Sequence, residues 1–134
     1  DEAIIELMRK FGEKIGMAFQ IRDDLLDYGT DDIGKPKGID IKEKKMTLPL
    51  IYALEKASRS EKRHIIKLIK RHNTKPDKVR EVIEFVLKSG GIEYTKKVMY
   101  DYRDQAFELL HQFPLSPARE SLEDLVNFVV DRKK

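Results

Sequence analysis

Apolar side chains recur at steps of three and four residues from Ile4 to Leu26, and this spacing constrains the fold more than any other feature of the chain. A helix of 3.6 residues per turn brings such positions onto one face. The repeat therefore predicts a long amphipathic helix over about residues 2–28. Gly12 and Gly16 lie four residues apart within it. Glycine otherwise destabilises a helix interior by about 1 kcal/mol, so we expect them to allow close approach of another helix or of a bulky ligand, and tight helix packing is the preferred interpretation.

Three carboxylates stand at the polar end of this helix, in the run F-Q-I-R-D-D-L-L-D that contains Asp23, Asp24 and Asp27. Asp23 and Asp27 lie on the same helix face, where two anions repel by about 0.2–0.5 kcal/mol. Aspartate also has a low helix propensity, so local structure does not explain the cluster. A cation would reverse the repulsion. Mg²⁺ suits this pattern best, because it takes a few carboxylate oxygens, keeps waters and bridges to phosphate.

The segment 29–46 shows no helical periodicity, and it mixes acids with lysines. A connection of this length is often functional. Its breakers and charges are Gly29, Asp31, Asp32, Gly34, Lys35, Pro36, Lys37, Gly38, Asp40, Lys42, Glu43, Lys44 and Lys45. Carboxylates for a metal beside lysines for an anion suit a bound diphosphate with divalent cations. We therefore predict a substrate loop here.

The remaining residues, 47–134, predict five more helices and no strand. Thr47 and either Ser58 or Ser60 are typical N-caps, Pro76 is typical of a first turn, and Ser89-Gly90-Gly91 is typical of a helix end. The sequence therefore predicts a single all-α segment over residues 1–134.

Composition excludes several classes of protein. With no cysteine, the chain has neither a disulfide framework nor a cysteine–zinc site. No apolar run approaches the roughly 20 residues that span a bilayer, so we expect no transmembrane segment. These features are compatible with a cytoplasmic location, which we predict.

Residues 59–80 carry nine lysines and arginines against Glu61 and Asp77. Such a run could meet a nucleic acid or an anionic membrane surface. It contains no interleaved aromatic residue and no nucleic-acid reading motif. We therefore interpret it as a solvated helix face and predict no nucleic-acid partner. His64 and His72 lie in the same run and are interpreted as surface residues.

Three motifs at their joint spacing resemble one family. They are F-Q-I-R-D-D-L-L-D, G-K-P-K-G-I-D and K-K-M-T-L-P-L-I, and the later S-G-G-I-E and F-V-V-D-R-K-K are also similar. The chain resembles the C-terminal half of trans-isoprenyl (polyprenyl) diphosphate synthases of the octaprenyl, heptaprenyl or geranylgeranyl type. The resemblance implies an all-α helical bundle, in which two aspartate-rich motifs face each other across a central cavity.

The resemblance also implies roles for individual residues. Asp23 and Asp27, supported by Asp24, would bind Mg²⁺ that bridges an allylic diphosphate. Gln20 would orient this cluster or the diphosphate. The implied catalytic residues are Asp23, Asp24, Asp27 and Lys45, and the implied substrate-binding residues are Gln20, Lys35, Asp40 and Lys45. The chain departs from the family at Lys44, where many members have glycine, so we expect the loop to lie differently there.

The implied reaction is loss of diphosphate from an allylic substrate, attack by isopentenyl diphosphate, and loss of a proton. Nothing in the chain matches the family's first aspartate-rich motif. We therefore expect a C-terminal fragment of a longer synthase, whose missing N-terminal half is its partner and whose parent is a homodimer. The fragment alone is not expected to elongate prenyl chains. The alternative is a non-catalytic helical interaction or regulatory module. A class I terpene cyclase is disfavoured, because those enzymes usually carry an Asn/Ser/Glu-type second metal motif.

Overall fold

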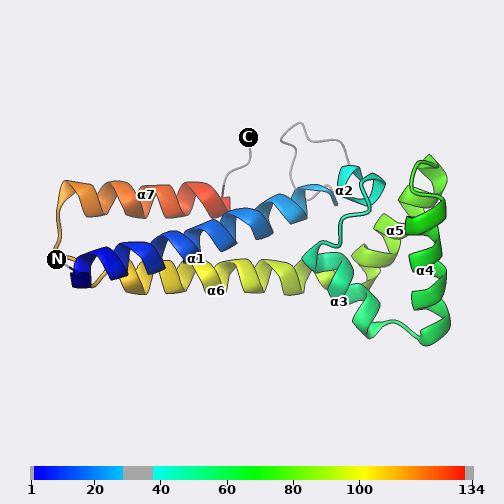
Figure 1. Cartoon of the computed structure of the whole chain (residues 1–134), viewed down its shortest axis with the longest axis horizontal. Helices are drawn as coiled ribbons and strands as arrows, with labels where there is room; N and C mark the ends of the chain where they lie inside the picture. The colour runs from blue at the N-terminus through cyan, green and yellow to red at the C-terminus, as the bar shows by residue number, and fades with distance from the viewer. Residues whose placement is uncertain (1, 29–37, 132–134) are drawn as a thin grey trace. The chain divides into compact units, whose positions relative to one another are not determined.

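The computed structural model describes residues 2–28 and 38–131, and all regular structure within these ranges is helical. The helices are α1 (Glu2–Leu26), α2 (Ile39–Lys42), α3 (Leu48–Lys56), α4 (Arg59–Arg71), α5 (Pro76–Ser89), α6 (Gly91–Leu110) and α7 (Pro117–Asp131). Figure 1 shows them in chain order. The predicted all-α class is confirmed. Within the described ranges, no helix has the combination of length and apolar character that crossing a membrane requires.

The six longer helices match the predicted ones, and their ends follow local chemistry. Ser58, rather than Ser60, caps α4, since its Oγ accepts the Glu61 N–H at 3.2 Å. Gly90 ends α5 in the left-handed region, with φ of 86°. Thr47 precedes α3 as predicted, but its side chain makes no capping hydrogen bond. The four-residue α2 was not predicted, because so short a helix has no periodicity to detect.

The chain divides into two compact units, one formed by residues up to Arg22 together with those from Lys97 on, and the other by Asp23–Lys96. In the first unit α1, α6 and α7 share a core, which Figure 1 shows as helices lying side by side. Its fully buried members are Phe11, Ala106, Leu110 and Val126. Because these residues come from all three helices, the core joins distant parts of the sequence.

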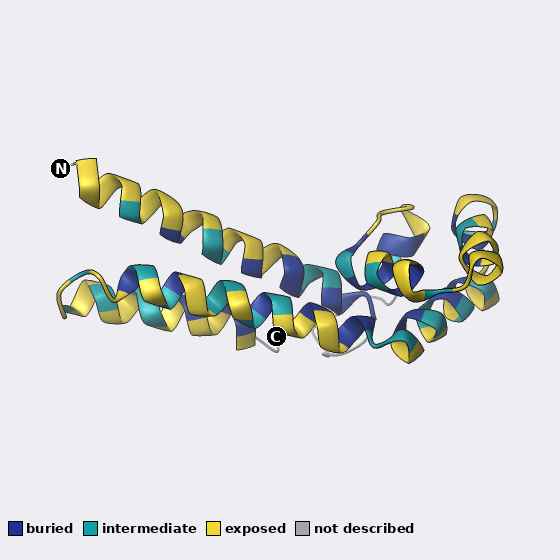
Figure 2. Cartoon of the chain, turned by 90° about the horizontal axis from the view of Figure 1, so that it is seen from below, coloured by how far each residue is buried: buried dark blue, intermediate teal, exposed yellow. Residues whose placement is uncertain are grey.

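The beginning of α1 is more exposed than the periodic pattern predicts. Ile4, Ile5 and Met8 are exposed, whereas buried residues concentrate toward the end of the helix (Figure 2). A Cβ atom added at Gly12 or Gly16 would meet no other described atom within 4 Å. The prediction of tight packing at these glycines is therefore wrong for the described residues. Periodicity shows which face is apolar, but it does not show what covers that face.

In the second unit α5 contacts α2, α3 and α4. Two glycines make close contacts here. A Cβ atom on Gly91 would lie 2.6 Å from the backbone oxygen of Pro49, so α6 begins directly against the first turn of α3. Gly38 has φ of 83°, and a Cβ atom on it would lie 2.5 Å from Cγ1 of Val79 on α5. These contacts fix both ends of the segment that carries Asp40 and Lys45.

Candidate functional site

Asp27 connects the end of α1 to the start of α2. Its Oδ1 atom accepts the Asp40 N–H at 3.0 Å, and its backbone oxygen accepts the Gly38 N–H at 3.1 Å. The Asp27 side chain is fully buried, and Asp40 is 4% exposed. Asp27 was predicted as a metal ligand, but one of its carboxylate oxygens is already used to hold the loop.

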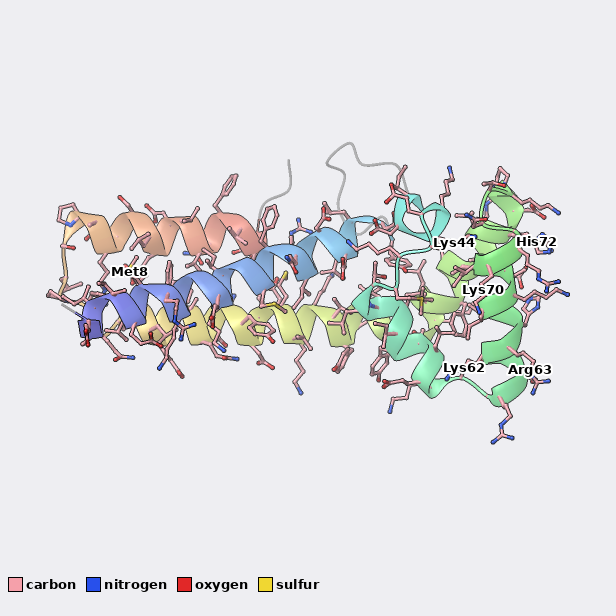
Figure 3. The ribbon with its side chains drawn as sticks, in the orientation of Figure 1. Met8, Lys44, Lys62, Arg63, Lys70 and His72 are labelled. Atoms are coloured by element: carbon pink, nitrogen blue, oxygen red, sulfur yellow. The ribbon has the colours of Figure 1, made fainter. Side chains whose placement is uncertain are left out.

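A left-handed residue turns the chain back after α2. Lys44 has φ of 61°, the one positive φ of a non-glycine residue in the described ranges. Its N–H donates to the Ile41 oxygen at 3.0 Å, and the next N–H, of Lys45, donates to the Asp40 oxygen at 2.8 Å. The loop was expected to differ here because lysine replaces glycine. Lys44 (labelled in Figure 3) takes up a conformation that glycine adopts more easily, and the expected difference from other members stays a prediction.

This turn brings Lys45 to Asp24. The Lys45 Nζ lies 3.4 Å from Asp24 Oδ1, although the two residues come from different segments. The other oxygen, Asp24 Oδ2, accepts the Leu48 N–H at 3.3 Å, where α3 begins. The Asp24 carboxylate therefore lies between the loop lysine and the first turn of a helix, and its side chain is only 16% exposed.

The two charges perturb each other's protonation. Burial raises the pKa of the Asp24 carboxyl above its ordinary value, although the Leu48 N–H and the Lys45 ammonium oppose this shift. Burial also opposes the charge on Lys45, but the carboxylates of Asp24 and Asp40 outweigh it and raise the Lys45 pKa. The Asp24 anion is thus only partly compensated by its protein contacts. A further cation would stabilise it.

Two residues that were not predicted as site residues support this arrangement. The hydroxyl groups of Tyr28 and Thr47 lie 3.2 Å apart in a buried contact. Burial, together with the nearby carboxylates of Asp27 and Asp40, raises the Tyr28 pKa, so its phenol stays neutral. The contact joins the residue after Asp27 to the residue before α3. The position of Thr47 before a helix was the only sequence signal for it, and that signal indicated a cap instead.

The other three residues predicted for the site lie in different surroundings. Asp23 is half-buried beside Asp24 at the end of α1, and Gln20 is exposed on α1 within the first unit. Lys35 lies outside the described residues. Within residues 2–28 and 38–131, no three or more His, Cys, Asp or Glu side chains form a group that could hold a metal ion by themselves.

The carboxylates at the end of α1 nevertheless fit Mg²⁺ that is held partly by substrate phosphates and waters. This ion needs only one or two protein carboxylates when substrate phosphates and waters complete its shell. Asp23 and Asp24 offer carboxylate oxygens at one helix end, and the Asp24 carboxylate is incompletely compensated. The site is thus suited to an ion that arrives with an anionic ligand.

Comparison with known proteins shows the family. The Polyprenyl synthetase family model matches residues 1–86. The short chain isoprenyl diphosphate synthase of Methanothermobacter thermautotrophicus is 39% identical over 131 residues, which cover 96% of this chain and 40% of that protein. The crystal structure of geranylgeranyl pyrophosphate synthase from Bacteroides thetaiotaomicron superimposes with a TM-score of 0.87 at 38% identity, covering 98% of this chain and 44% of that one.

A second solved structure adds bound ligands. The polyprenyl synthase from Caulobacter crescentus, complexed with calcium and isoprenyl diphosphate, has a TM-score of 0.87 and 36% identity to this chain. The match covers 100% of this chain and 42% of the Caulobacter chain. The fold and the sequence together define an all-α protein of the prenyl synthase class. The chain belongs to the polyprenyl synthetase family. It spans about 40% of the length of the Methanothermobacter relative.

Proposed function

We propose that this chain provides the second aspartate-rich site of a trans-isoprenyl diphosphate synthase. The whole enzyme would condense isopentenyl diphosphate with an allylic diphosphate and release diphosphate, so that the prenyl chain grows by one unit. The segment described above would bind the allylic diphosphate through Mg²⁺ and lysine. The observation that carries this proposal is the partly compensated Asp24 carboxylate beside Lys45.

The residues divide into two groups by their contacts. Asp23 and Asp24 would hold Mg²⁺, which neutralises negative charge that grows on the leaving diphosphate. Lys45 would donate to the diphosphate oxygens from the other side of the loop. Asp27 and Asp40 would position the loop, because Asp27 is fully buried and bonded to the Asp40 N–H. Gln20 and Lys35 stay proposed contacts of the cluster and the diphosphate.

Two observations on relatives support a divalent cation and a prenyl diphosphate. The Caulobacter crescentus protein is complexed with both calcium and isoprenyl diphosphate. The Methanothermobacter thermautotrophicus relative is an isoprenyl diphosphate synthase. Magnesium as the working ion, a homodimeric parent and a cytoplasmic location are further parts of this proposal.

Ligand-dependent thermal stability tests the site without requiring turnover. Mg²⁺ with inorganic diphosphate should raise the melting temperature of the chain by several degrees, because a ligand at roughly 100 times its Kd stabilises a folded protein by about 2.7 kcal/mol. Asp24→Asn and Lys45→Ala should each lose most of this increase. The comparison is made within each variant, with and without ligands, so that a change in basal stability does not matter.

Two neighbouring substitutions serve as controls. Glu43→Gln removes a carboxylate and Lys42→Ala removes a lysine from the same segment, and both residues are exposed. Both variants should keep the wild-type response. Equal responses in Asp24→Asn and Glu43→Gln would contradict the proposed site, and a chain that never responds to Mg²⁺ and diphosphate would favour the non-catalytic module.

A further inference from the structure

The outer face of α4 carries five exposed cations that the proposed function does not use. This basic strip consists of Arg59, Arg63, Lys67, Lys70 and Arg71. The first four recur at steps of four, four and three residues, so they lie along one side of the helix. Figure 3 labels Arg63 and Lys70 of this strip on α4. At 1.5 Å per residue, the strip from Arg59 to Arg71 is about 18 Å long.

The opposite side of α4 is the side that packs. Ile65, Leu68 and Ile69 are buried there, and α4 contacts α5. The strip is therefore the solvent side of a helix that is fixed in its rotation. A fixed rotation presents all five cations in the same direction.

The strip lacks neutralising partners among the described residues. Among the described residues none of its five members forms an ion pair within 4.0 Å, and Glu61 is the one acidic residue on α4 itself. Partial desolvation, followed by repulsion from Lys75 and Lys67, holds the pKa of His72 below its ordinary value. A histidine at the end of α4 thus experiences the positive potential of this surface.

We propose that the basic strip of α4 is a docking surface for the anionic headgroups of a lipid bilayer. Its charge is complementary to such a surface, and its straight, convex row of long side chains suits a flat partner. The strip exposes no aromatic or large apolar residue, so the contact is adsorption at the surface rather than insertion. Binding that depends on charge alone weakens as salt is added.

Nucleic acid is the less suitable partner. Single-stranded nucleic acid is bound largely by base stacking on aromatic side chains, and residues 59–80 contain none. The choice of a bilayer also rests on the proposed function, since a long prenyl diphosphate carries an apolar chain that partitions into a bilayer rather than into water. A synthase that lies on the membrane surface releases such a product where it partitions.

Vesicle co-sedimentation tests the strip. The chain is mixed with phosphatidylserine–phosphatidylcholine vesicles, with pure phosphatidylcholine vesicles, and with generic double-stranded DNA, at low salt and at roughly 0.15 M salt. We expect binding to the anionic vesicles only, weaker at the higher salt. Each Lys or Arg near an anionic surface strengthens binding about fivefold, so Arg63→Gln/Lys67→Gln/Lys70→Gln should bind about a hundredfold more weakly.

A second triple variant provides the matched control. Lys88→Gln/Lys96→Gln/Lys97→Gln removes the same net charge from exposed positions on α5 and α6, and it should bind almost as the wild type does. Equal weakening in both triple variants, or DNA binding as strong as vesicle binding, would overturn the proposal. Circular dichroism confirms that both variants keep their helices.

The outcome is separable from that of the proposed function. The strip variant should keep the thermal response to Mg²⁺ and diphosphate, because none of its three residues contacts Asp24 or Lys45. If the wild type does not bind the anionic vesicles but still responds to Mg²⁺ and diphosphate, only the docking surface is overturned. Vesicle binding without a diphosphate response would overturn the proposed function and leave only the electrostatic part of this inference.

Discussion

In the loop, one residue adopts a strained backbone conformation, and this conformation positions the side chain of the next residue. Lys44 adopts the left-handed conformation at φ of 61°, which costs a side-chain-bearing residue about 1 kcal/mol. The conformation directs the next residue, Lys45, to within 3.4 Å of Asp24. The strain is therefore located beside the charge pair on which the proposed function depends.

Replacing Lys44 with glycine should stabilise the protein. Because glycine adopts the left-handed region without a steric penalty, we expect Lys44→Gly to raise the free energy of unfolding by about 0.5–1 kcal/mol. Chemical denaturation measures this change. Lys42→Gly, inside α2, should instead lower stability by a similar amount. A destabilised Lys44→Gly would mean that the Lys44 side chain itself holds the turn.

The buried Asp27 carboxylate should matter for stability as well as for binding. Asp27→Ala leaves the Asp40 N–H without its acceptor, so we expect a loss of about 1–3 kcal/mol in the free energy of unfolding. Asp27→Asn keeps an acceptor oxygen and should lose less. Asp101→Ala, at an exposed position of α6, is the control and should change stability by less than about 0.5 kcal/mol. An Asp27→Ala variant as stable as this control would exclude the positioning role.

At the scale of elements, glycine has opposite roles in α1 and α6. Gly12 is exposed inside α1 with open space around it, whereas Gly91 begins α6 against the backbone of Pro49. The same substitution should therefore have opposite signs at the two positions. Gly12→Ala should raise stability by up to about 1 kcal/mol, and Gly91→Ala should lower it by about 1–3 kcal/mol. Thermal denaturation of both variants checks the pair, and a neutral Gly91→Ala would show that α3 and α6 separate readily.

The end of α4 should make stability depend on pH. The pKa of His72 is lowered from 6.5 in the folded chain, so the unfolded chain takes up the proton first as the pH falls. Stability is therefore present above 6.5 and is lost as the pH falls through the lower, folded pKa. Denaturation between about pH 7.5 and about pH 5.5 should show a smaller loss in His72→Gln than in the wild type.

Other titrating groups are common to both proteins in that comparison. The contacts His64–Glu81 and His111–Glu123 are present in both, so the two proteins differ at His72 alone. An equal or larger loss of stability in His72→Gln would contradict the assigned direction of the shift.

The elements were more predictable from sequence than the contacts between them. Ser58, Pro76 and Gly90 mark helix ends by local chemistry, and the structure has helix ends at each. The burial of Asp27 was not predictable, because its partner N–H is thirteen residues further along the chain. The approach of Lys45 to Asp24 could be expected only from the resemblance, since it depends on one left-handed residue between them.

At the scale of the whole molecule, the first unit exposes a large apolar surface. Ile4 is 49%, Ile5 67% and Met8 40% exposed on the first turns of α1. Exposed apolar groups of this kind mark surfaces that another chain or segment covers. The proposed N-terminal half of the synthase and a second copy of this chain are both suitable partners.

The isolated chain should therefore self-associate as its concentration rises. Ile5→Lys/Met8→Lys should weaken this association by roughly tenfold or more, because each tenfold corresponds to about 1.4 kcal/mol of lost apolar contact. Sedimentation equilibrium measures it. Leu87→Lys changes a 46% exposed leucine on α5, in the other unit, and should leave the association intact. A wild-type chain that stays monomeric at all concentrations would contradict this prediction.

The hydrogen bond from the Leu48 N–H to Asp24 gives the protein a built-in spectroscopic reporter. The two residues are 24 positions apart, and Leu48 is not itself among the residues proposed to hold Mg²⁺ or the diphosphate. Any occupant that draws the Asp24 carboxylate toward itself alters the hydrogen bond of this one amide. In an isotope-labelled sample, the chemical shift of the Leu48 amide would then change as the site fills. An amide at the start of α3 would thus report binding at the Asp24 carboxylate.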